Sequence, residues 1–330
     1  MSALPPQLAP WLAPRSEDQA QRPVLALGTM NFGKRTPAAE ARRIVDRALE
    51  RGVRFFDTAN VYGSGESERI LGQVLRGRRE EVGLATKVGL ARVKGRPEGL
   101  SAVRVERALE ESLERLGTDS VDLFYLHQPD PATPLEETLE GVGRLLRAGK
   151  ARQWGVSNFA AWQILELNML CDARGLPRPA VSQVLYNVLV RQIEVEYLPF
   201  TRRHPLHTTV YNPLAGGVLT GRYAPGAPLP SDSRLSSNKM YQGRYGSSRL
   251  LEQVEALRAV AQAEGMDLVT LAYAWLAGRP GVDSVLVGPG SVGHLDAALD
   301  AWNRPLSSEA LARIDALHQA FLGTDARYAR

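Results

Sequence analysis

Short apolar runs alternate with longer amphipathic stretches along most of the chain. The first run is VLALG at residues 24–28, and the stretch 36–52 that follows repeats its apolar side chains at helical spacing. The clearest helix is expected within residues 101–119, where Val105 and Leu109 belong to one apolar face and charged residues lie opposite. An alternation of this kind is typical of a domain in which strands and helices follow one another.

The pattern predicts eight strands, each followed by a helix. The expected strands are residues 24–28, 53–58, 81–88, 121–128, 151–158, 180–187, 206–213 and 283–290. The expected helices are residues 36–52, 67–77, 101–119, 134–150, 160–175, 194–204, 249–265 and 291–302, with additional ones at 270–278 and 307–321. Eight such units favour a closed (β/α)8 TIM barrel with a parallel sheet and extra C-terminal helices. A six-stranded open sheet would need fewer units and a domain break, and no linker is visible.

Two segments fall outside this alternation. Residues 1–22 carry four prolines in the first fourteen positions, so we expect a flexible tail there and a single barrel domain over residues 23–330. Residues 223–248, in the long loop after the seventh strand, are rich in Gly, Pro and Ser and lack apolar periodicity. A structureless stretch of this length is usually functional or disordered, so we expect a mobile flap over the site.

Composition narrows the class of protein. Of the 330 residues 44% are hydrophobic, enough for a large core, and the formal net charge is +4. Basic residues are interleaved with 36 acidic ones, so neither a nucleic-acid patch nor a membrane span of ~18 apolar residues is expected. The single cysteine, Cys171, and the lack of a secretory signal fit a reducing, cytoplasmic location. The five histidines are scattered, so no metal is expected.

Four polar residues follow the ends of three consecutive expected strands. Asp57 ends the second strand, with Tyr62 five residues later; Lys87 ends the third and His127 the fourth. A barrel keeps its chemistry at the carboxyl ends of its strands. Each of these groups alone could lie in a solvated loop, but burying them at the ends of apolar runs is costly without partners. Together they predict an active site.

These four side chains suit proton transfer by a phenol. Tyrosine has a reference pKa of about 10, so Tyr62 can donate a proton at pH 7. A nearby ammonium such as Lys87 would stabilise the phenolate, and Asp57 can hold that ammonium in place. His127 can hydrogen-bond a substrate oxygen. Such a set serves carbonyl reduction, in which a cofactor supplies the hydride.

The segment VLVGPGSVGHL at residues 285–295 contains Gly288, Gly290 and Gly293 in the spacing G-x-G-x-x-G. That spacing marks the first turn of a doubly wound dinucleotide fold, but here it follows the last expected strand. In a barrel this loop is a common phosphate site, because glycines admit the ligand and a helix N-terminus offers free N–H groups. A tight turn without a ligand is the alternative.

Several motifs together resemble the aldo-keto reductase superfamily. They are GTMNFG, FDTANVYGSGESE, ATKV, VDLFYLHQPD, WGVSNF and YNPLAGGVLTGRY, in the expected order from about residue 24 onward. The segments CDARG and the terminal RYAR look similar to the aflatoxin-aldehyde/succinic-semialdehyde reductase subgroup. The resemblance implies a single barrel that binds NADPH in extended form and reduces aldehydes and ketones to alcohols. It also implies that Asp57, Tyr62, Lys87 and His127 are the catalytic four.

The resemblance assigns further residues to the cofactor and the substrate. The implied cofactor contacts are Ser157, Asn158, Gln183, Tyr211, Asn212, Leu214, Arg222, Gly288, Ser291 and His294. Among them, the first three match residues that bond the nicotinamide carboxamide, Tyr211 matches the aromatic that stacks on its ring, and Gly288 and Ser291 match contacts to the 2′-phosphate. The implied substrate pocket is Met30, Phe32, Tyr186, Arg244, Tyr328 and Arg330. An arginine there could pair a substrate carboxylate bidentately.

The glycine loop departs from the family pattern. Relatives often carry Gln and Asn where this chain has His294 and Ala298, which leaves the adenine contacts and the choice between NADPH and NADH open. No acidic residue lies within GPGSVG, which favours the phosphorylated cofactor. The alternative readings are an NADPH-binding regulatory protein resembling potassium-channel β subunits and a dehydrogenase that mainly oxidises alcohols. A monomer and a homodimer are both compatible with the sequence.

Overall fold

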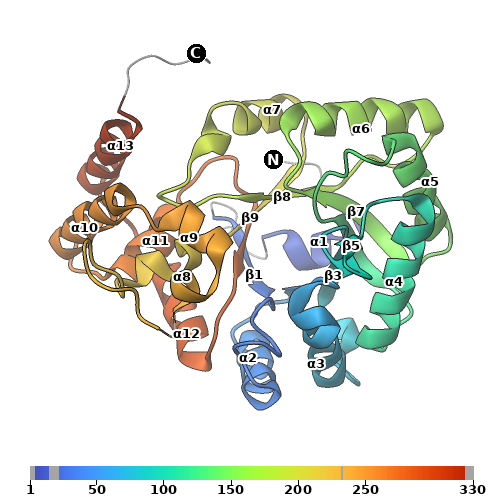
Figure 1. The fold of residues 1–330 in the computed structure, drawn as a ribbon, viewed down its shortest axis with the longest axis horizontal. Helices are drawn as coiled ribbons and strands as arrows, with labels where there is room; N and C mark the ends of the chain where they lie inside the picture. The colour runs from blue at the N-terminus through green and yellow to red at the C-terminus, as the bar shows by residue number, and fades with distance from the viewer. Residues whose placement is uncertain (1–3, 15–21, 232, 324–330) are drawn as a thin grey trace. The chain divides into compact units, whose positions relative to one another are not determined.

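Eight parallel strands close into a barrel in the computed structural model, which describes residues 4–14, 22–231 and 233–323 (Figure 1). The strands are β1 (Val24–Gly28), β2 (Phe55–Asp57), β3 (Gly83–Val88), β6 (Val121–Leu126), β7 (Ala151–Ser157), β8 (Val181–Leu185), β9 (His207–Tyr211) and β10 (Ser284–Val287). Each strand neighbours the next along the chain, and β10 closes the ring onto β1. The predicted (β/α)8 barrel is therefore confirmed.

Helices follow the strands as the apolar periodicity predicts. They are α2 (Ala38–Glu50), α3 (Glu66–Val74), α4 (Ala102–Leu116), α5 (Leu135–Arg147), α6 (Ala161–Arg174), α7 (Tyr197–Arg203), α10 (Ser248–Ala263), α11 (Leu268–Ala277), α12 (Val292–Ala301) and α13 (Ser308–Leu322). Helix α4 buries Val105 and Leu109 and ends at Gly117, whose φ of 64° is the left-handed conformation that glycine tolerates. Within the described residues, no helix has the length and apolar content needed to cross a bilayer.

The strand interiors form the core, and polar side chains enter it at specific positions. Every residue of β3 and β6 is buried, as expected for parallel strands covered on both faces. Asp57 is the last residue of β2, and Lys87 is the next to last of β3. A two-stranded hairpin, β4 (Arg92–Val93) with β5 (Arg96–Pro97), follows β3. The barrel thus presents its polar residues at the carboxyl ends of its strands.

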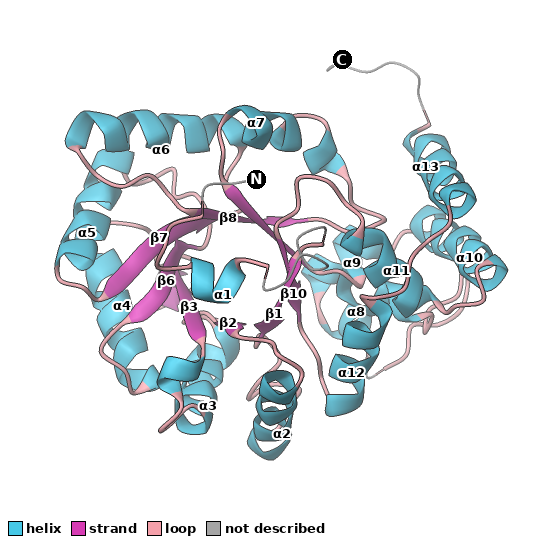
Figure 2. Cartoon of the chain, turned by 180° about the vertical axis from the view of Figure 1, so that it is seen from behind, coloured by secondary structure: helices cyan, strands magenta, loops and turns pink. Residues whose placement is uncertain are grey.

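The N-terminal segment differs from the flexible tail predicted over residues 1–22. Residues Ala9–Leu12 form one helical turn, α1, and Leu8 and Leu12 are buried. Pro10 occupies the first turn of α1, where a missing N–H costs no helical hydrogen bond. Trp11 packs against Gly83 at the start of β3, and α1 lies across the amino-terminal end of the barrel (Figure 2). Residues 1–3 and 15–21 lie outside the described part of the chain.

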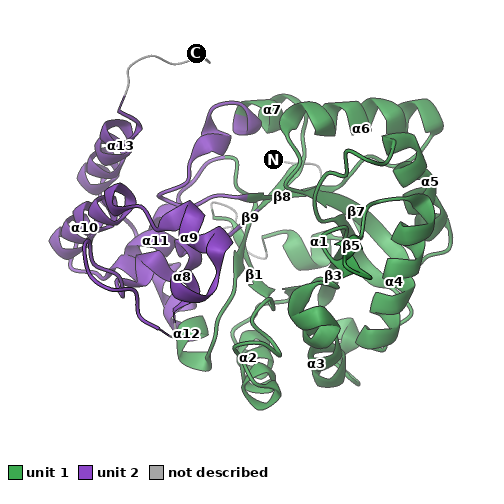
Figure 3. Ribbon diagram, viewed as in Figure 1, with its two compact units in different colours: residues 1–184, 199–209, 281–295 green, residues 185–198, 210–280, 296–330 purple. Residues whose placement is uncertain are grey.

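The described chain divides into two compact units (Figure 3). Unit 1 consists of residues 1–184, 199–209 and 281–295, and unit 2 of residues 185–198, 210–280 and 296–330. Unit 1 contains all barrel strands except the last residue of β8 and the last two of β9. The single-domain organisation over residues 23–330 stays a prediction.

The segment 223–248 was expected to lack regular structure, and this is wrong for part of it. Two short helices, α8 (Arg234–Ser237) and α9 (Lys239–Tyr245), lie within it. Ser233 and Asn238 cap them by accepting backbone N–H groups, and Tyr245 is fully buried. These helices could not be predicted from the sequence because each is too short to show a repeat of apolar residues at helical spacing. Closure of this segment over a cofactor stays a prediction.

A buried histidine at the start of β9 makes the fold sensitive to acid. The His207 ring lies 3.0 Å from the Ser284 hydroxyl, and burial lowers the pKa of His207 to about 3. An unfolded histidine titrates near 6.5, so only the unfolded chain gains a proton as the pH falls from there toward 3. The stabilisation is complete above pH 6.5 and is lost progressively below it. We expect this group to remove on the order of 4 kcal/mol from the free energy of unfolding across that range.

Urea denaturation of the wild type and of His207→Gln at pH 7, 5 and 4 measures this effect. Glutamine retains a nitrogen that can reach Ser284 but does not titrate, so the variant should lose stability with acid more gently. Contributions from the carboxylates are common to both proteins and cancel in the comparison. An equal loss of stability in both proteins would show that His207 does not carry the acid sensitivity.

Candidate active site

A buried lysine joins the residues that the sequence placed at the ends of β2 and β3. The Lys87 ammonium is fully buried and donates hydrogen bonds to the Asp57 carboxylate and, at 2.8 Å, to the Thr58 carbonyl oxygen. The Tyr62 hydroxyl lies 3.5 Å from the same nitrogen. Burying an ammonium is costly unless it is paired and hydrogen-bonded, and these acceptors meet that requirement. The structure therefore brings Asp57, Tyr62 and Lys87 together as predicted.

Two opposing influences act on Asp57. Burial raises the pKa of the Asp57 carboxyl, while the charge of Lys87 and hydrogen bonds from Lys87 and Gln183 lower it, and burial prevails. The charges of Asp57 and Lys87 attract each other, and this attraction offsets the free-energy cost of burying both groups. Lys87 also lies 5.1 Å from the centroid of the Tyr62 ring, so the phenol borders a fixed positive charge.

His127 lies beside Tyr62. The two rings meet edge to face, with centroids 5.8 Å apart and planes at 83°. Burial, and secondarily the charge of Lys87, holds the pKa of His127 well below its usual value. The imidazole is therefore neutral at pH 7 and is suited to exchanging a hydrogen bond with an uncharged oxygen.

Tyr62 is held on a tight turn between β2 and α3. The turn spans Tyr62–Gly65, and Gly63, Ser64 and Gly65 have φ values of 57°, 55° and 89°. Ser64 is not a glycine, yet it adopts the left-handed conformation. That conformation costs free energy for a residue with a Cβ and persists only where the surrounding structure enforces it. The glycines of this turn are visible in the sequence, but the sequence does not show that the turn places the Tyr62 hydroxyl beside Lys87.

The three residues predicted to bond the nicotinamide carboxamide lie in unit 1 together with the catalytic four. The Asn158 side chain donates to the His127 carbonyl oxygen at 2.9 Å, and its own φ is 63°. The Gln183 amide donates to Asp57 at 2.9 Å and is almost fully buried. Gln183 therefore has a role that the sequence did not suggest, as a second partner of the buried carboxylate. Ser157, the last residue of β7, is also buried.

The glycine loop leads from β10 into α12. None of Gly288, Gly290 and Gly293 has a positive φ, so the turn itself does not require glycine. A Cβ at Gly288 would find only the Gly28 carbonyl oxygen, at 3.9 Å, and one at Gly293 only the Ser291 hydroxyl, at 3.9 Å. The backbone of this loop is therefore open to close approach, which fits a phosphate-bearing ligand better than a tight turn.

The structure adds an acidic residue that the sequence did not associate with this loop. The Glu40 carboxylate of α2 accepts the Val292 backbone N–H at 2.9 Å and pairs with Arg43 at 2.8 Å. Glu40 and Val292 are 252 positions apart, so no local motif could connect them. The first turn of α12 thus holds a negative charge at the place assigned to the 2′-phosphate. The segment GPGSVG itself contains no acidic residue, as the sequence shows, but its neighbour Glu40 supplies one from a distant part of the chain.

The remaining predicted residues divide between the two units. Tyr186, Tyr211, Asn212, Leu214, Arg222 and Arg244 belong to unit 2, whereas Met30 and Phe32 belong to unit 1 with Ser291 and His294. Phe32 is fully buried, and its place in the substrate pocket stays a prediction. Tyr186 is buried too, and its hydroxyl donates to Glu194 at 2.5 Å. Tyr328 and Arg330 lie outside the described residues.

Within unit 2, Asn212 is tied to the segment after β9. Its side chain donates to the Tyr245 hydroxyl at 2.8 Å and accepts the Gly216 N–H at 2.6 Å, with φ of 65°. Tyr211 is the last residue of β9. The stacking and pyrophosphate roles of Tyr211, Leu214 and Arg222 stay predictions.

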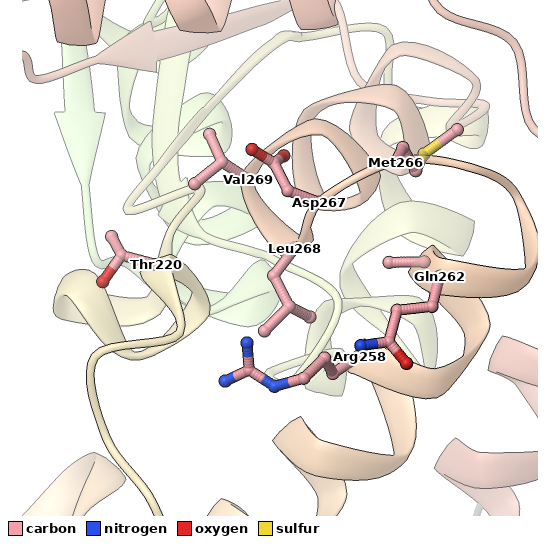
Figure 4. Close-up of a pocket in the computed structure, with 8 residues that line it drawn as sticks. Thr220, Arg258, Gln262, Met266, Asp267, Leu268 and Val269 are labelled. Atoms are coloured by element: carbon pink, nitrogen blue, oxygen red, sulfur yellow. The ribbon is translucent and has the colours of Figure 1, made fainter.

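A cavity of about 220 Å³ occurs in unit 2 (Figure 4). Its lining residues are Thr220, Arg258, Ala261, Gln262, Met266, Asp267, Leu268 and Val269, none of which is a predicted site residue. The Arg258 guanidinium is already held by Glu255 at 2.9 Å and by the Gly221 carbonyl oxygen at 3.2 Å. Asp267 caps α11 through Thr270. The charged groups of this cavity therefore have structural partners.

Comparison with known proteins agrees with the motifs. Residues 24–319 match the model of the Aldo/keto reductase family. The chain is 37% identical to Aflatoxin B1 aldehyde reductase member 2 of Homo sapiens, over 96% of this chain and 91% of that one. It is 38% identical to a probable voltage-gated potassium channel subunit beta of Arabidopsis thaliana, over 78% and 80% of the two chains. It is 35% identical to the uncharacterized oxidoreductase YrpG of Bacillus subtilis, over 88% and 90%.

Proposed function

Because the chain belongs to the aldo/keto reductase family, we propose that it reduces aldehydes and ketones to alcohols with NADPH, and that Tyr62 delivers the proton. The observation that carries this proposal is the position of the Tyr62 hydroxyl 3.5 Å from the buried Lys87 ammonium. A positive charge at that distance favours the phenolate that remains after proton transfer. Positioned acid catalysis of this kind accelerates reactions by about 10²–10⁴-fold.

Each of the four residues has a task in this proposal. Tyr62 gives its proton to the substrate oxygen, Lys87 stabilises the phenolate, and Asp57 keeps Lys87 charged and oriented. Neutral His127 orients the carbonyl by a hydrogen bond. The neutral imidazole suits this buried position because burying a protonated imidazolium would cost more free energy. NADPH, when bound, supplies the hydride to the carbonyl carbon.

The residues available for the cofactor fit a nicotinamide nucleotide. Ser157, Asn158 and Gln183 offer hydroxyl and amide groups next to the catalytic four, as a carboxamide requires. The open backbone around Gly288 and Gly293 suits a phosphate ester at the start of α12. The related reductase from Homo sapiens is named for an aldehyde substrate, which supports an aldehyde as the substrate class.

A panel of aldehydes with NADPH and NADH tests the proposal directly. We expect 4-nitrobenzaldehyde and a carboxylate-bearing aldehyde to be reduced with consumption of NADPH, and Arg244→Ala to weaken binding of the carboxylate-bearing one alone. Assaying the corresponding alcohols with NADP⁺ compares the two directions. Failure of every carbonyl and alcohol to react would overturn the enzymatic proposal.

The alternative is an NADPH-binding regulatory subunit, favoured by the 38% identity to a probable voltage-gated potassium channel subunit beta. The catalytic four are compatible with both roles, so turnover decides between them. Copurification with a membrane protein, together with NADPH binding but no oxidation of NADPH by any carbonyl, would favour the regulatory role. Rapid reduction of free aldehydes would favour the enzyme.

We expect NADPH to bind more tightly than NADH, and Glu40→Gln to widen that preference. The Glu40 carboxylate at Val292 would repel a 2′-phosphate, whereas glutamine keeps an oxygen for the same N–H. Removal of one partly exposed charge should improve NADPH affinity by about three- to five-fold and leave NADH affinity unchanged. Fluorescence titration with both cofactors measures this. Glu50→Gln, on the same helix and paired with Arg47 at the surface, is the matched control.

Two results would count against this expectation. Equal or tighter binding of NADH by the wild type would remove the basis for NADPH as the cofactor. An unchanged NADPH affinity in Glu40→Gln would mean that the 2′-phosphate does not approach Val292.

A further inference from the structure

Three buried hydroxyl groups meet where β1 and β2 end and α3 begins. The Ser67 oxygen lies 2.8 Å from the Thr29 hydroxyl and 2.9 Å from the Thr58 hydroxyl. It also lies 2.8 Å from the Thr29 carbonyl oxygen, and the Thr29 hydroxyl donates to the Asp57 carbonyl oxygen at 3.0 Å. All three side chains are fully buried. This hydroxyl cluster of Thr29, Thr58 and Ser67 contains none of the residues predicted from the sequence.

The number of available protons decides which hydroxyl of the cluster donates and which accepts. The three hydroxyl groups carry three protons and make four hydrogen-bond contacts. One assignment gives each hydroxyl a proton to donate: Thr58 donates to Ser67, Ser67 donates to Thr29, and Thr29 donates to the Asp57 carbonyl oxygen. The Ser67 proton is then shared between the hydroxyl and the carbonyl oxygen of Thr29. Hydrogen bonds in such a chain polarise one another in a buried site. Because the chain starts and ends on the consecutive residues Thr58 and Asp57, it fixes the start of α3 against the end of β2.

Asp57, the last residue of β2, and Thr58, which follows it, also hold the catalytic lysine. Lys87 donates to the Asp57 carboxylate and to the Thr58 carbonyl oxygen, so the dipeptide is bound by Lys87 on one side and by Ser67 on the other. The next residue of α3, Glu68, accepts the Thr86 hydroxyl at 2.5 Å. Thr86 immediately precedes Lys87 in β3. The first turn of α3 is therefore hydrogen-bonded to the ends of both strands that carry the ion pair, β2 and β3.

Tyr62 reaches α3 only through the strained turn that contains Ser64. A turn with three consecutive left-handed residues keeps its shape when both of its ends are fixed. One end follows β2, and the other is the start of α3, which Ser67 fixes. We propose that Ser67 is a positioning residue for the carbonyl reduction proposed above, because it holds the turn that keeps the Tyr62 hydroxyl beside Lys87. This inference rests on the proposed function, and Ser67 itself does not touch the reacting atoms.

The test compares Ser67→Ala with a matched pair at the neighbouring hydroxyl, Thr58→Val and Thr58→Ser. We expect kcat for a reactive aldehyde to fall by about 10- to 100-fold in Ser67→Ala and Thr58→Val, as for a small misplacement of a reacting group. The KM and the NADPH dissociation constant should stay within about two-fold, because no binding residue changes. Thr58→Ser keeps the hydroxyl and should retain wild-type kcat. Thermal melts identify any variant that has not folded, and the Thr58 pair keeps the test decisive if Ser67→Ala does not fold.

A second measurement separates this inference from the proposed function. Tyrosine labelled with ¹³C at the phenol carbon reports the pH at which Tyr62 ionises, and the Tyr62→Phe variant identifies its signal without any turnover. In the part of the chain that the structure describes, Lys87 and His127 lie beside Tyr62 and Asp57 pairs with Lys87, and all three are unchanged in Ser67→Ala. We expect the Tyr62 signal to titrate at higher pH in Ser67→Ala than in the wild type, since the ammonium would lie farther from the phenol.

The outcomes are distinct. A wild type that reduces no carbonyl but shows the shifted titration in Ser67→Ala overturns the proposed function and supports Ser67 as the residue that places Tyr62 beside Lys87. A wild type that reduces aldehydes, with kcat and titration unchanged in Ser67→Ala, overturns the positioning role alone. An equal loss of kcat in Thr58→Val and Thr58→Ser also overturns it, because the hydroxyl would then be irrelevant.

Discussion

Replacing Tyr62 by phenylalanine should nearly abolish carbonyl reduction and leave NADPH binding almost intact. The substitution removes the hydroxyl 3.5 Å from Lys87 and keeps the ring that meets His127 edge to face. Because only the proton donor is lost, we expect kcat to fall by about 10²–10⁴-fold. Single-turnover reduction of 4-nitrobenzaldehyde, followed by NADPH absorbance, measures the loss, and fluorescence titration measures NADPH binding.

A second tyrosine offers a matched control for this variant. The centroid of the Tyr125 ring in β6 lies 5.7 Å from the Lys87 nitrogen, so Tyr125→Phe also removes a hydroxyl from a ring that borders the ammonium. We expect Tyr125→Phe to retain turnover, because Tyr125 has no part in the proposed proton transfer. Wild-type turnover by Tyr62→Phe would show that Tyr62 is not the acid and would refute the roles proposed for all four residues.

Replacing Lys87 by methionine should stop turnover and also weaken the fold. Methionine preserves the length of the buried stem but leaves the Asp57 carboxyl without its cation, and removal of one partner of a buried pair typically costs about 3–5 kcal/mol. Burial already raises the pKa of Asp57, and loss of Lys87 raises it further. The folded variant therefore takes up a proton at a higher pH than the unfolded chain does. Its deficit in stability should shrink as the pH falls from 7 toward 5.

The double variant Lys87→Met/Asp57→Asn separates folding from chemistry. Asparagine removes the uncompensated charge and can still accept the Gln183 hydrogen bond, so most of the lost stability should return while activity stays absent. Urea denaturation at pH 7 and 5, with the wild type and Asp57→Asn alongside, provides the comparison. A double variant no more stable than Lys87→Met would indicate that the unpaired Asp57 charge is not what destabilises the fold.

The barrel and the meeting of Asp57, Tyr62 and Lys87 could be predicted because their signals are local. Helix α4 shows its buried face in the spacing of Val105 and Leu109, and the polar residues Asp57 and Lys87 stand out at the ends of apolar runs. Parallel strands bring such ends to one edge of a barrel, so the sequence order alone indicates that they converge.

Other features could not be predicted because they depend on distant or weak signals. The contact between Glu40 and Val292 spans 252 positions, and the one between Gln183 and Asp57 spans 126. Ser67 lies within a recognised motif, yet nothing local shows which hydroxyls it meets. The single turn of α1 is too short to show an apolar period, and the prolines around it suggested a flexible tail without a helix.

The division of the chain into two units has an evolutionary consequence. All residues of the proposed proton transfer belong to unit 1, whereas Tyr186 and Arg244, assigned to the substrate, belong to unit 2. Arg244 is exposed on the short helix α9, where substitutions disturb little packing. Under the proposed roles, a substitution at Arg244 would change the substrate preference without touching the hydroxyl cluster or the ion pair of unit 1, so selection could act on substrate choice and on the proton transfer separately.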